Sequence, residues 1–534
     1  MFLEIRDIKL HIEEGEETLR EMISQKLKVD VSDIKSYRIL RKSIDARKKG
    51  NIYFIYNIAV EVDDNKTFTK KVSGMDICLL QELKYTFSDY GKEIIENRPI
   101  IIGCGPAGLF SALVLAERGY RPLILERGRE IDRRTLDIEN FMEGKGFSEK
   151  SNIQFGEGGA GTYSDGKLTT RIKDPRISYV LEKFVEFGAP DEIQYENKPH
   201  IGTDVLKKVI KNMRKQIENL GGQVLFDSQV TGIIEKSGSA CGVVIEGKGD
   251  VASNAIICAI GHSARDTYEM LYKKGFTMEA KPIAIGVRVE HLQEMIDEAQ
   301  YGIYSGHFRL GAADYMLTHR SESTGRSVYT FCMCPGGFVV AAASEKNKLV
   351  VNGMSYNKRD GINANSAMVV TVQPKDYGQC HPLSGIGFQR YWEEKAYILG
   401  GGEYSAPIQL ISDFLQDKPT KKFGRIKPTY RPSVTFAELK KCLPDYVTIS
   451  LKEALKAFDK KIKGFAYDEG ILTGIETRTS APLRIIRKEN MESVNLSNFY
   501  PAGEGAGYAG GIMSSAIDGI KVAEAIMNRY KPLE

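Results

Sequence analysis

The sequence predicts an α/β fold in which a parallel-sheet domain is interrupted by a mostly antiparallel sheet domain and preceded by a small α+β domain. Three observations support this prediction. Residues 99–126 alternate strand, helix and strand within one short unit, which is how a parallel α/β sheet begins. Residues 280–465 consist mainly of strand-like runs, and residues 1–90 carry strand and helix patterns of their own. The length of 534 residues suits two or three domains.

Changes of pattern along the chain give the expected domain boundaries. The N-terminal domain covers residues 1–92, where IRDIKLHI and NIYFIYNIAVEV read as strands and ETLREMISQKLKV has helical spacing. The parallel-sheet domain is expected in two parts, 96–275 and 466–534. The inserted domain, 276–465, holds runs such as IAIGVRVEH and SAMVVTVQ and little helix before TFAELKKCL.

Composition and charge narrow the class of protein. The 42% hydrophobic and 27% charged residues are those of a globular protein, and 74 cations against 70 anions give no argument for a nucleic-acid partner. The eight cysteines lack even spacing, so we expect no disulfide framework. The N-terminus carries charges where a signal peptide needs an apolar run, and no segment reaches the ~18 apolar residues of a membrane span. These features predict a cytoplasmic protein without a membrane partner.

One basic run interrupts this balance. Residues 35–49 carry seven lysines and arginines. Such a run is usually a solvated face, and a patch that binds RNA or a protein partner is the alternative. We therefore do not expect a nucleic-acid partner, and residues 35–49 are the segment that would bind one in the alternative interpretation.

A dinucleotide-binding fingerprint follows the first strand of the parallel-sheet domain. The strand 99–102 runs into GCGPAG, and a helix pattern and a second strand ending in Glu126 follow. The glycines permit a tight turn, close approach to a pyrophosphate and close helix packing, while the helix N-terminus favours anions. An acid at Glu126 accepts hydrogen bonds from ribose hydroxyls and disfavours the 2′-phosphate of NADP. The predicted cofactor-binding residues here are Gly103, Gly105, Pro106, Ala107, Gly108, Glu126 and Arg127.

Distal motifs indicate that the dinucleotide is FAD. The strand before Gly261 resembles the A-T-G strand end of two-dinucleotide-fold flavoproteins, with Ile260 where Thr is usual. The segment PAGEG resembles their C-terminal G-D motif, in which an acid contacts the ribityl chain, and Glu504 replaces the Asp. The helix after Gly511 could face the flavin with its N-terminus. These motifs add Ala259, Gly261, Gly503, Glu504, Gly510, Gly511 and Ile512 to the predicted FAD site. The strand-like stretch 223–230 resembles the segment that places a backbone group near the adenine in such flavoproteins, and it adds Val230.

The stretch FGEGGAGTYSDGKLTT at 155–170 falls one residue short of the P-loop G-x-x-x-x-G-K-[ST]. Leu168 stands where the magnesium-binding hydroxyl is needed, and Asp174-Pro175 prevents a long helix from opening there. We therefore interpret the stretch as a loop near the flavin, whose glycines let backbone N–H groups approach the cofactor. Lys167 points either inward, toward flavin or an anionic substrate, or outward to solvent. The predicted contacts are Gly158, Gly159, Gly161, Thr162 and Lys167.

Taken together, these motifs resemble the glutathione-reductase-type FAD superfamily, and more closely the bacterial group of FAD-dependent, or NAD(FAD)-utilising, dehydrogenases. GCGPAG, FGEGGAGTYSDGKL, GHSARD, FCMCPGG, ETRTSAP and PAGEGAGYAGG carry the resemblance. The resemblance covers nearly the whole chain and implies an FAD-dependent oxidoreductase. It does not supply the substrate.

The sequence does not identify the electron donor that reduces the flavin. No second strand–GxGxxG–helix unit follows, because the glycines at 400–402 lead into EYSAPIQ. NADH or NADPH, if it is the donor, is therefore expected to bind transiently at the flavin. Cys332 and Cys334 end a strand, where residues two apart share a face at ~6–7 Å, too far for an unstrained disulfide. Two packed thiols are favoured over a redox pair, and no metal site is expected because further zinc ligands are missing.

The sequence offers three candidates for catalytic residues. Lys167, His381 and Arg478 are the candidates, with His262 and His307 as further histidines that are more often structural. Arg478 could line the substrate side of the flavin or form a buried salt bridge. The predicted function is flavin N5 hydride transfer on an unidentified small molecule. The alternatives are a nucleic-acid-modifying flavoenzyme docking through the basic segment, and a non-catalytic flavin redox sensor. Oligomeric state is not predicted.

Overall fold

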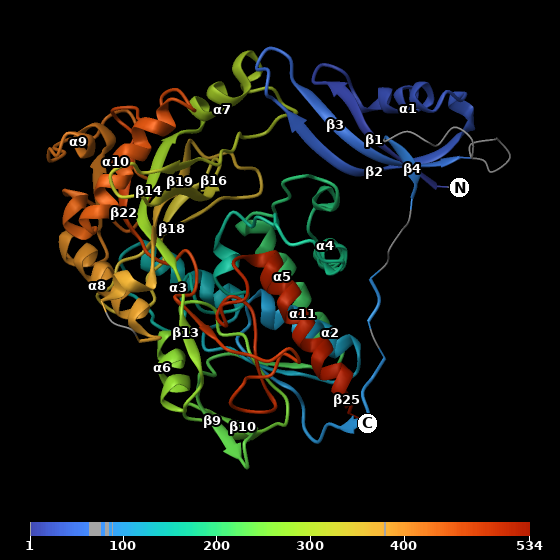
Figure 1. Cartoon of the computed structure of the whole chain (residues 1–534), viewed down its shortest axis with the longest axis vertical. Coiled ribbons are helices and arrows are strands. Elements are labelled where there is room, and N and C mark those ends of the chain that lie inside the picture. The colour runs from blue at the N-terminus through green and yellow to red at the C-terminus, as the bar shows by residue number, and fades with distance from the viewer. Residues whose placement is uncertain (1, 63–75, 81–84, 88, 379–380, 534) are drawn as a thin grey trace.

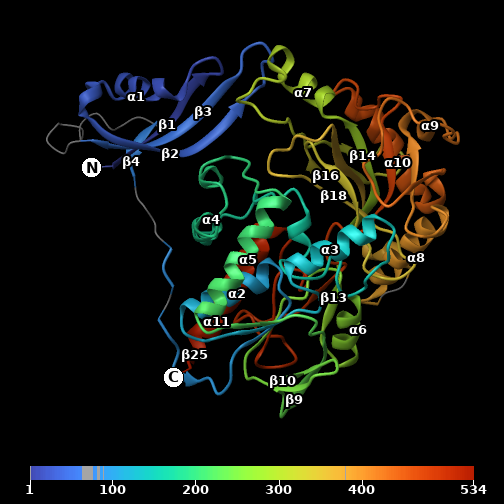
Figure 2. The same ribbon diagram turned by 180° about the vertical axis from the view of Figure 1, so that it is seen from behind.

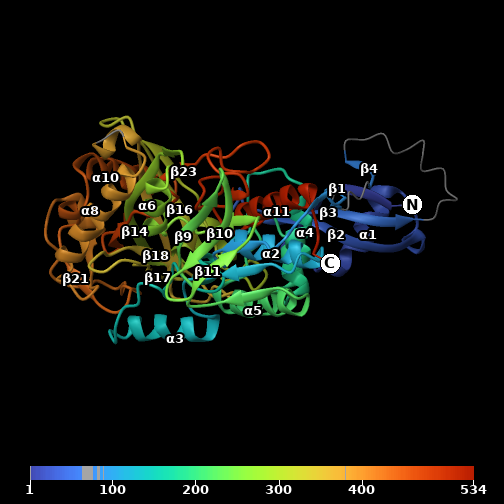
Figure 3. The same cartoon turned by 90° about the horizontal axis from the view of Figure 1, so that it is seen from below.

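The structure is a computed structural model that describes residues 2–62, 76–80, 85–87, 89–378 and 381–533 (Figure 1). Seen from below, the N-terminal sheet lies at one end of the molecule and helices α8 and α10 lie at the other (Figure 3). The parallel-sheet region lies between them. No helix among the described residues is long and apolar enough to cross a membrane.

The N-terminal unit is an antiparallel sheet with one helix on it. Its strand order is β2-β3-β1-β4, with bounds β1 Phe2–His11, β2 Ile34–Asp45, β3 Tyr53–Val62 and β4 Ile77–Leu79. Helix α1 (Leu19–Leu27) buries Leu19, Ile23 and Leu27, one residue per turn, against the sheet. The apolar core of this sheet continues into that of the seven-stranded sheet. The predicted α+β unit is thus present, and its basic run lies largely on β2.

A five-stranded parallel sheet forms the centre of the molecule. Its order is β24-β12-β6-β7-β8, with bounds β6 Ile100–Ile102, β7 Leu123–Leu125, β8 Gln223–Leu225, β12 Ile256–Cys258 and β24 Phe499–Pro501. All residues of β6, β7, β12 and β24 are buried, as expected for short parallel strands covered on both faces. Helices α2 (Pro106–Glu117), α5 (Thr203–Asn219) and α11 (Ile512–Arg529) gather beside one another on this sheet (Figure 2).

Smaller elements complete this region. An antiparallel sheet of β9, β10 and β11 projects from it, and two further pairs, β13 with β23 and β5 with β25, join distant segments. The strand bounds are β5 Glu93–Ile94, β9 Val230–Lys236, β10 Ser239–Ile245, β11 Gly249–Ala252, β13 Met278–Ala280, β23 Leu483–Ile485 and β25 Tyr530–Lys531. The helices are α3 Ile131–Met142, α4 Arg176–Glu186 and α6 Arg265–Lys273.

The inserted region is built on a seven-stranded, mostly antiparallel sheet, as predicted. Its order is β15-β16-β19-β14-β22-β20-β21, and only the β20–β21 pair is parallel. The bounds are β14 Ile283–Leu292, β15 Thr318–Arg320, β16 Ser327–Cys334, β19 Asn363–Val372, β20 Ala406–Leu410, β21 Val434–Phe436 and β22 Ile471–Glu476. A two-stranded sheet of β17 (Phe338–Ala341) and β18 (Val351–Met354) lies next to it.

Two details of this region differ from the sequence prediction. Helices α7 (Gln293–Tyr301), α8 (Ser384–Leu399), α9 (Ile411–Leu415) and α10 (Asp445–Asp459) make it richer in helix than predicted, whereas most of TFAELKKCL is strand β21 and a 3₁₀ turn. Gly385 and Gly387 at the start of α8 weaken its helical pattern in the sequence. The sheet also continues past residue 465, because β22 pairs with β14 and β20.

Candidate functional site

A cavity of about 1220 Å³ opens at the carboxyl ends of the parallel strands. Its wall includes the residues that directly follow β6, β7, β12 and β24, which are Gly103, Glu126, Ala259 and Ala502. Ligands of open α/β sheets bind at this edge. Other parts of the wall include β15, β16 and the 165–171 loop. The volume exceeds the ~300–1,000 Å³ of most ligand pockets, so the cavity can hold a large cofactor and leave room beside it.

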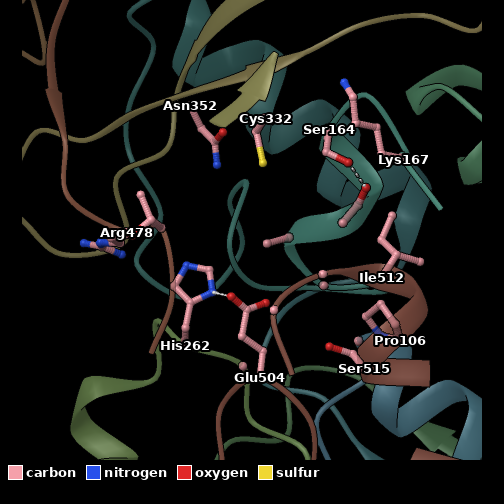
Figure 4. Close-up of a pocket in the computed structure, with 18 of the residues that line it drawn as sticks. Pro106, Ser164, Lys167, His262, Cys332, Asn352, Arg478, Glu504, Ile512 and Ser515 are labelled. Carbon is pink, nitrogen blue, oxygen red and sulfur yellow. Dashed lines mark hydrogen bonds and ion pairs between the residues drawn. The ribbon is translucent and has the colours of Figure 1, made fainter. Parts of the chain in front are cut away.

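Two helix N-termini face this cavity without side-chain caps. Gly105 precedes α2 and Gly511 precedes α11, and neither helix has a side chain bonded to its first N–H groups. Pro106 and Ile512, the first residues of the two helices, both line the cavity (Figure 4). Uncapped N–H groups at a positive helix end favour an anion such as a pyrophosphate. The cavity therefore offers two places for the polar parts of a dinucleotide.

Glycine is needed where two loops of the wall approach each other. Gly103 has a φ of +103°, and a Cβ there would lie 2.4 Å from the carbonyl oxygen of Ala259. Gly159 has a φ of +64°, and its Cβ would lie 2.9 Å from the Cα of Gly105. A side chain at either position would push apart the backbone that forms this part of the cavity wall.

Glu126 connects three loops of this wall by hydrogen bonds. Its carboxylate accepts hydrogen bonds from the backbone N–H groups of Cys104 at 2.8 Å, Gly128 at 2.9 Å and Gly156 at 3.0 Å. Oε2 carries one of these bonds, which leaves this oxygen with acceptor capacity toward the cavity that Glu126 lines. The sequence predicted the ribose contact and missed this structural role, for which it holds no signal.

Sixteen of the twenty residues predicted to bind the cofactor line this one cavity. They are Gly103, Gly105, Pro106, Ala107, Glu126, Arg127, Gly159, Gly161, Lys167, Val230, Ala259, Gly261, Glu504, Gly510, Gly511 and Ile512. The other four, which are Gly108, Gly158, Thr162 and Gly503, are not part of its lining. The motifs thus converge in space although they span some 400 positions of the chain.

A histidine and a glutamate meet on the cavity wall. His262 Nδ1 lies 3.5 Å from Glu504 Oε1, and Figure 4 shows the His262 ring between Glu504 and Arg478. Burial raises the pKa of Glu504 to about 7, although Lys281 acts against this. Burial, together with Arg478 and Arg265, lowers the pKa of His262 to about 3. At neutral pH the histidine is therefore uncharged, and the carboxyl group is close to its titration point.

Arg478 lines the cavity and belongs to a buried ion cluster. Its Nη2 lies 2.9 Å from Glu393 Oε2, while Arg265 Nη2 lies 2.6 Å from the other oxygen of the same carboxylate. Burial alone would raise the pKa of Glu393, but the two arginines outweigh it and hold the pKa well below its ordinary value. The sequence left Arg478 between a flavin-side role and a buried salt bridge, and its position combines cavity lining with the salt bridge.

Lys167 lies in the cavity wall with its amine engaged. The amine pairs with Asp165 at 2.8 Å and also donates to the carbonyl oxygen of Met333. Arg359 binds the same carboxylate. Burial alone would raise the pKa of Asp165, but Lys167 and Arg359 outweigh it and keep the group ionised. No helix follows Lys167 before α4 at Arg176, which agrees with rejecting a P-loop here.

The two cysteines of β16 do not share a face, contrary to the sequence prediction. A bulge between Phe331 and Cys334 shifts the register against β19 and gives Cys332 a φ of +44°. Both residues line the cavity, but Cys332 is exposed and points into it (Figure 4), whereas Cys334 is buried, and both thiols are free. Buried Arg288 donates to the Cys332 carbonyl oxygen at 2.9 Å. Desolvation inside the protein raises the pKa of Cys332 to about 12, although Arg288 opposes it, so its thiol is neutral.

The remaining histidine candidates do not line the cavity. His381 accepts a hydrogen bond from the backbone N–H of Leu383 and packs its ring 4.6 Å from that of Tyr272. His307 stacks on Phe308. Gln379 and Cys380, which precede His381, lie outside the described residues. The structure thus brings Lys167, Arg478 and His262 to the cavity, and not His381 or His307.

Several cavity residues escaped sequence reasoning. They are Asp165, Arg171, Lys198, Arg320, Asn352 and Arg359. The sequence held a signal for Asp165, since this residue directly precedes Gly166-Lys167 in the glycine-rich loop. The others come from segments without a motif, so only the folded arrangement brings them together.

These features fit FAD. Two uncapped helix N-termini suit the pyrophosphate and the flavin, Glu126 retains acceptor capacity for ribose, and Glu504 stands where the ribityl chain is expected. The glycine contacts at Gly103 and Gly159 explain why the wall is open enough for close backbone approach.

Comparisons with known proteins agree with this assignment. Residues 282–479 match the family described as "FAD-dependent protein, C-terminal domain-like", and residues 3–61 match a domain of unknown function, DUF8436. An uncharacterized protein of Clostridium beijerinckii is 50% identical over 530 residues, which cover 99% of each chain. Protein FixC of Escherichia coli O157:H7 is 25% identical over 209 residues, which cover 37% of this chain and 43% of FixC.

The fold also resembles those of solved structures, among them a glycine oxidase and an L-proline dehydrogenase. Glycine oxidase from Bacillus cereus has 12% identity, covers 81% of this chain and 95% of that chain, and gives a TM-score of 0.32. L-Proline dehydrogenase from P. horikoshii has 13% identity, covers 82% of this chain and 94% of that chain, and gives 0.34. Scores this low carry no argument about function. The chain belongs to the family of the Clostridium beijerinckii protein. It is a flavoprotein, and its cofactor is FAD.

Proposed function

We propose that the protein is an FAD-dependent oxidoreductase that acts on a small molecule in the cavity between the parallel sheet and the seven-stranded sheet. In this proposal it belongs to the glutathione-reductase-type superfamily and, within it, to the NAD(FAD)-utilising dehydrogenase group. The observation that carries the proposal is the composition of a single cavity. The dinucleotide motifs form one part of its wall, and β15, β16 and the 165–171 loop form a second part that no dinucleotide motif supplies.

When bound, FAD supplies hydride transfer at its N5 atom. The chain supplies position and electrostatics. The N-termini of α2 and α11 bind anionic and electron-rich groups, and Glu126 binds ribose while it holds three loops together. Glu504 would bind the ribityl hydroxyls, and His262 Nδ1 lies 3.5 Å from its Oε1. The buried Arg478 is held in place by Glu393 and keeps a positive charge at the cavity wall.

Removal of a hydride from a C–H bond next to an O–H or N–H group also releases a proton. A group that exchanges this proton works best when its pKa lies close to the working pH. Glu504 meets this condition with a pKa of about 7, whereas neutral His262 and the neutral thiol of Cys332 do not. The carboxyl group of Glu504 is therefore the proposed place where this proton is held.

Anaerobic mixing of the FAD-loaded protein with NADH, NADPH or small candidate substrates tests the proposal. Bleaching of the flavin absorbance by one of these compounds is expected. A flavin that none of them reduces contradicts the enzyme proposal and favours the redox sensor. Reduction that requires added RNA favours the nucleic-acid-modifying alternative. The structure gives that alternative little support, since Lys42 pairs with Glu16 and Arg47 pairs with Asp45 in the basic segment.

A further inference from the structure

We infer that the second part of the cavity is a subsite for a small ligand that carries at least two carboxylate or phosphate groups. This inference rests on the proposed function, since it names the class of molecule that would meet the flavin. The subsite is defined by the wall residues of segments 165–171 and 314–334, together with Lys198, Asn352 and Arg359.

The charge of this wall is one-sided. Its arginines, lysines and aspartates are Lys167, Arg171, Lys198, Arg320, Arg359, Asp165 and Asp314. Five cations against two carboxylates give a formal charge of +3, whereas the whole chain of 534 residues carries only +4. A concentration of positive charge inside a concave site attracts anions.

The two carboxylates are already neutralised by other members of the wall. Asp165 binds both Lys167 and Arg359, and Asp314 lies 2.6 Å from Lys198. Among the residues that the structure describes, no carboxylate pairs with Arg171 or Arg320. Both side chains are exposed, so they are available to a ligand that enters the cavity. An arginine fork binds carboxylate and phosphate oxygens in pairs.

Asn352 adds a neutral donor whose direction is fixed by the protein. Its Oδ1 accepts hydrogen bonds from Arg288 Nη2 and from the backbone N–H of Gly353, each at 2.8 Å. Because the oxygen is engaged by these donors, the amide nitrogen is left to face the cavity, as Figure 4 shows. Arg288 is fully buried and also bonds to Glu476, so the amide cannot turn over without breaking several bonds. The wall therefore presents donors and positive charge.

Two sources share this chemistry. A small di- or tricarboxylate would use it as a substrate, and the phosphates of NADH or NADPH would use it during transient binding. The test takes the full-length, FAD-loaded protein and titrates it separately with citrate, with NADPH and with ADP-ribose. Binding is followed by calorimetry and by the shift of the flavin absorbance.

The variant Arg171→Gln/Arg320→Gln should bind the responsive probe about tenfold or more weakly, since it loses two positive charges and their charged hydrogen bonds to the ligand. Arg171→Lys/Arg320→Lys should recover part of the affinity, because it keeps the charge but not the paired donors of the guanidinium group. The control Lys173→Gln/Lys421→Gln removes the same two charges from exposed lysines that do not line the cavity. It should leave binding within about twofold of the wild type. The flavin spectrum of each variant reports that the fold and the FAD site are intact.

Saturable binding of citrate alone identifies the carboxylate source, and binding of NADPH and ADP-ribose identifies the nucleotide source. Failure of all three probes at millimolar concentration overturns the inference, as does equal weakening by the arginine variant and the lysine control. A wild-type protein that lacks a flavin spectrum even with added FAD would instead refute the proposed function. A protein with reducible flavin that binds no probe refutes only the subsite.

Discussion

Glu504 shows how one residue can link the state of the site to pH. It replaces the aspartate that is usual in the C-terminal motif, so its carboxyl group reaches one methylene further into the cavity wall. There it lies 3.5 Å from His262, and burial raises its pKa to about 7. A carboxylate accepts stronger hydrogen bonds from hydroxyl groups than a neutral carboxyl group does. The ionised form is therefore the better partner for the ribityl chain.

The affinity for FAD should accordingly increase as the pH rises through about 7. Below this value Glu504 is protonated and binds the hydroxyls weakly, and above it the carboxylate is present. A gain of one stronger hydrogen bond is worth ~1 kcal/mol, or about fivefold in Kd between pH 6 and 8. Quenching of flavin fluorescence measures this Kd. In Glu504→Gln, which cannot ionise, the Kd should stay constant over the same range. A variant with the slope of the wild type would show that another group titrates.

At the scale of elements, a buried ion cluster joins helices α6 and α8 to the segment that follows β22. Arg265 lies on α6, Glu393 on α8, and Arg478 two residues past the end of β22, so one carboxylate joins three segments. Glu393 is fully buried between these arginines. Removal of one partner from a buried pair leaves an uncompensated charge, which costs far more than the loss of an exposed ion pair.

Glu393→Gln should lower the free energy of unfolding by ~3–5 kcal/mol, because two buried guanidinium groups lose their counter-charge. Urea unfolding of the purified protein measures the change. Glu394→Gln is the matched control on the same helix, since Glu394 is 53% exposed and pairs with Lys348. Its effect should stay within ~0.5 kcal/mol. Equal effects of the two substitutions would mean that the cluster contributes no more than a surface pair.

The crossing of two loops is a second feature at this scale. Gly105 lies before α2, and Gly159 lies in the glycine-rich stretch 155–170. The two residues come so close that a Cβ on Gly159 would lie 2.9 Å from the Gly105 Cα. The shape of the cavity wall at the proposed phosphate site therefore depends on a glycine outside the GxGxxG fingerprint.

Gly159→Ala should weaken FAD binding at least about tenfold, because the new methyl group forces the two loops apart. Equilibrium dialysis with FAD measures the loss. Gly238→Ala controls for backbone strain, since Gly238 also has a positive φ, of +76°, but faces open space in the β9–β10 turn. Both variants should lose about 1 kcal/mol of stability, and only Gly159→Ala should lose the cofactor. Retained FAD affinity in Gly159→Ala would contradict the role of the loop crossing.

At the scale of the whole molecule, local patterns predicted the parts of the fold that depend on local chemistry. The parallel sheet follows from short apolar strands and a fingerprint whose glycines have a steric purpose, and the antiparallel sheet follows from long strand-like runs. Most of the predicted cofactor residues, from Gly103 to Ile512, belong to such local motifs, and they line one cavity.

The features that sequence reasoning missed depend on contacts between distant segments. The bulge at Cys332 arises where β16 changes register against β19 and Arg288 binds the Cys332 carbonyl oxygen. An alternating pattern cannot reveal such a shift. The cationic subsite likewise draws Arg171 and Arg320 from segments that carry no motif. Their meeting is a property of the tertiary structure alone.

The most direct test of this account is the absorption spectrum of the purified full-length protein before and after addition of FAD. We expect the spectrum of oxidised flavin, at one FAD per chain, and a rise in the free energy of unfolding of ~2.7 kcal/mol at an FAD concentration of about 100 times Kd. Absence of this spectrum even with excess FAD, in a protein that is folded by circular dichroism, would contradict the assignment of the cavity.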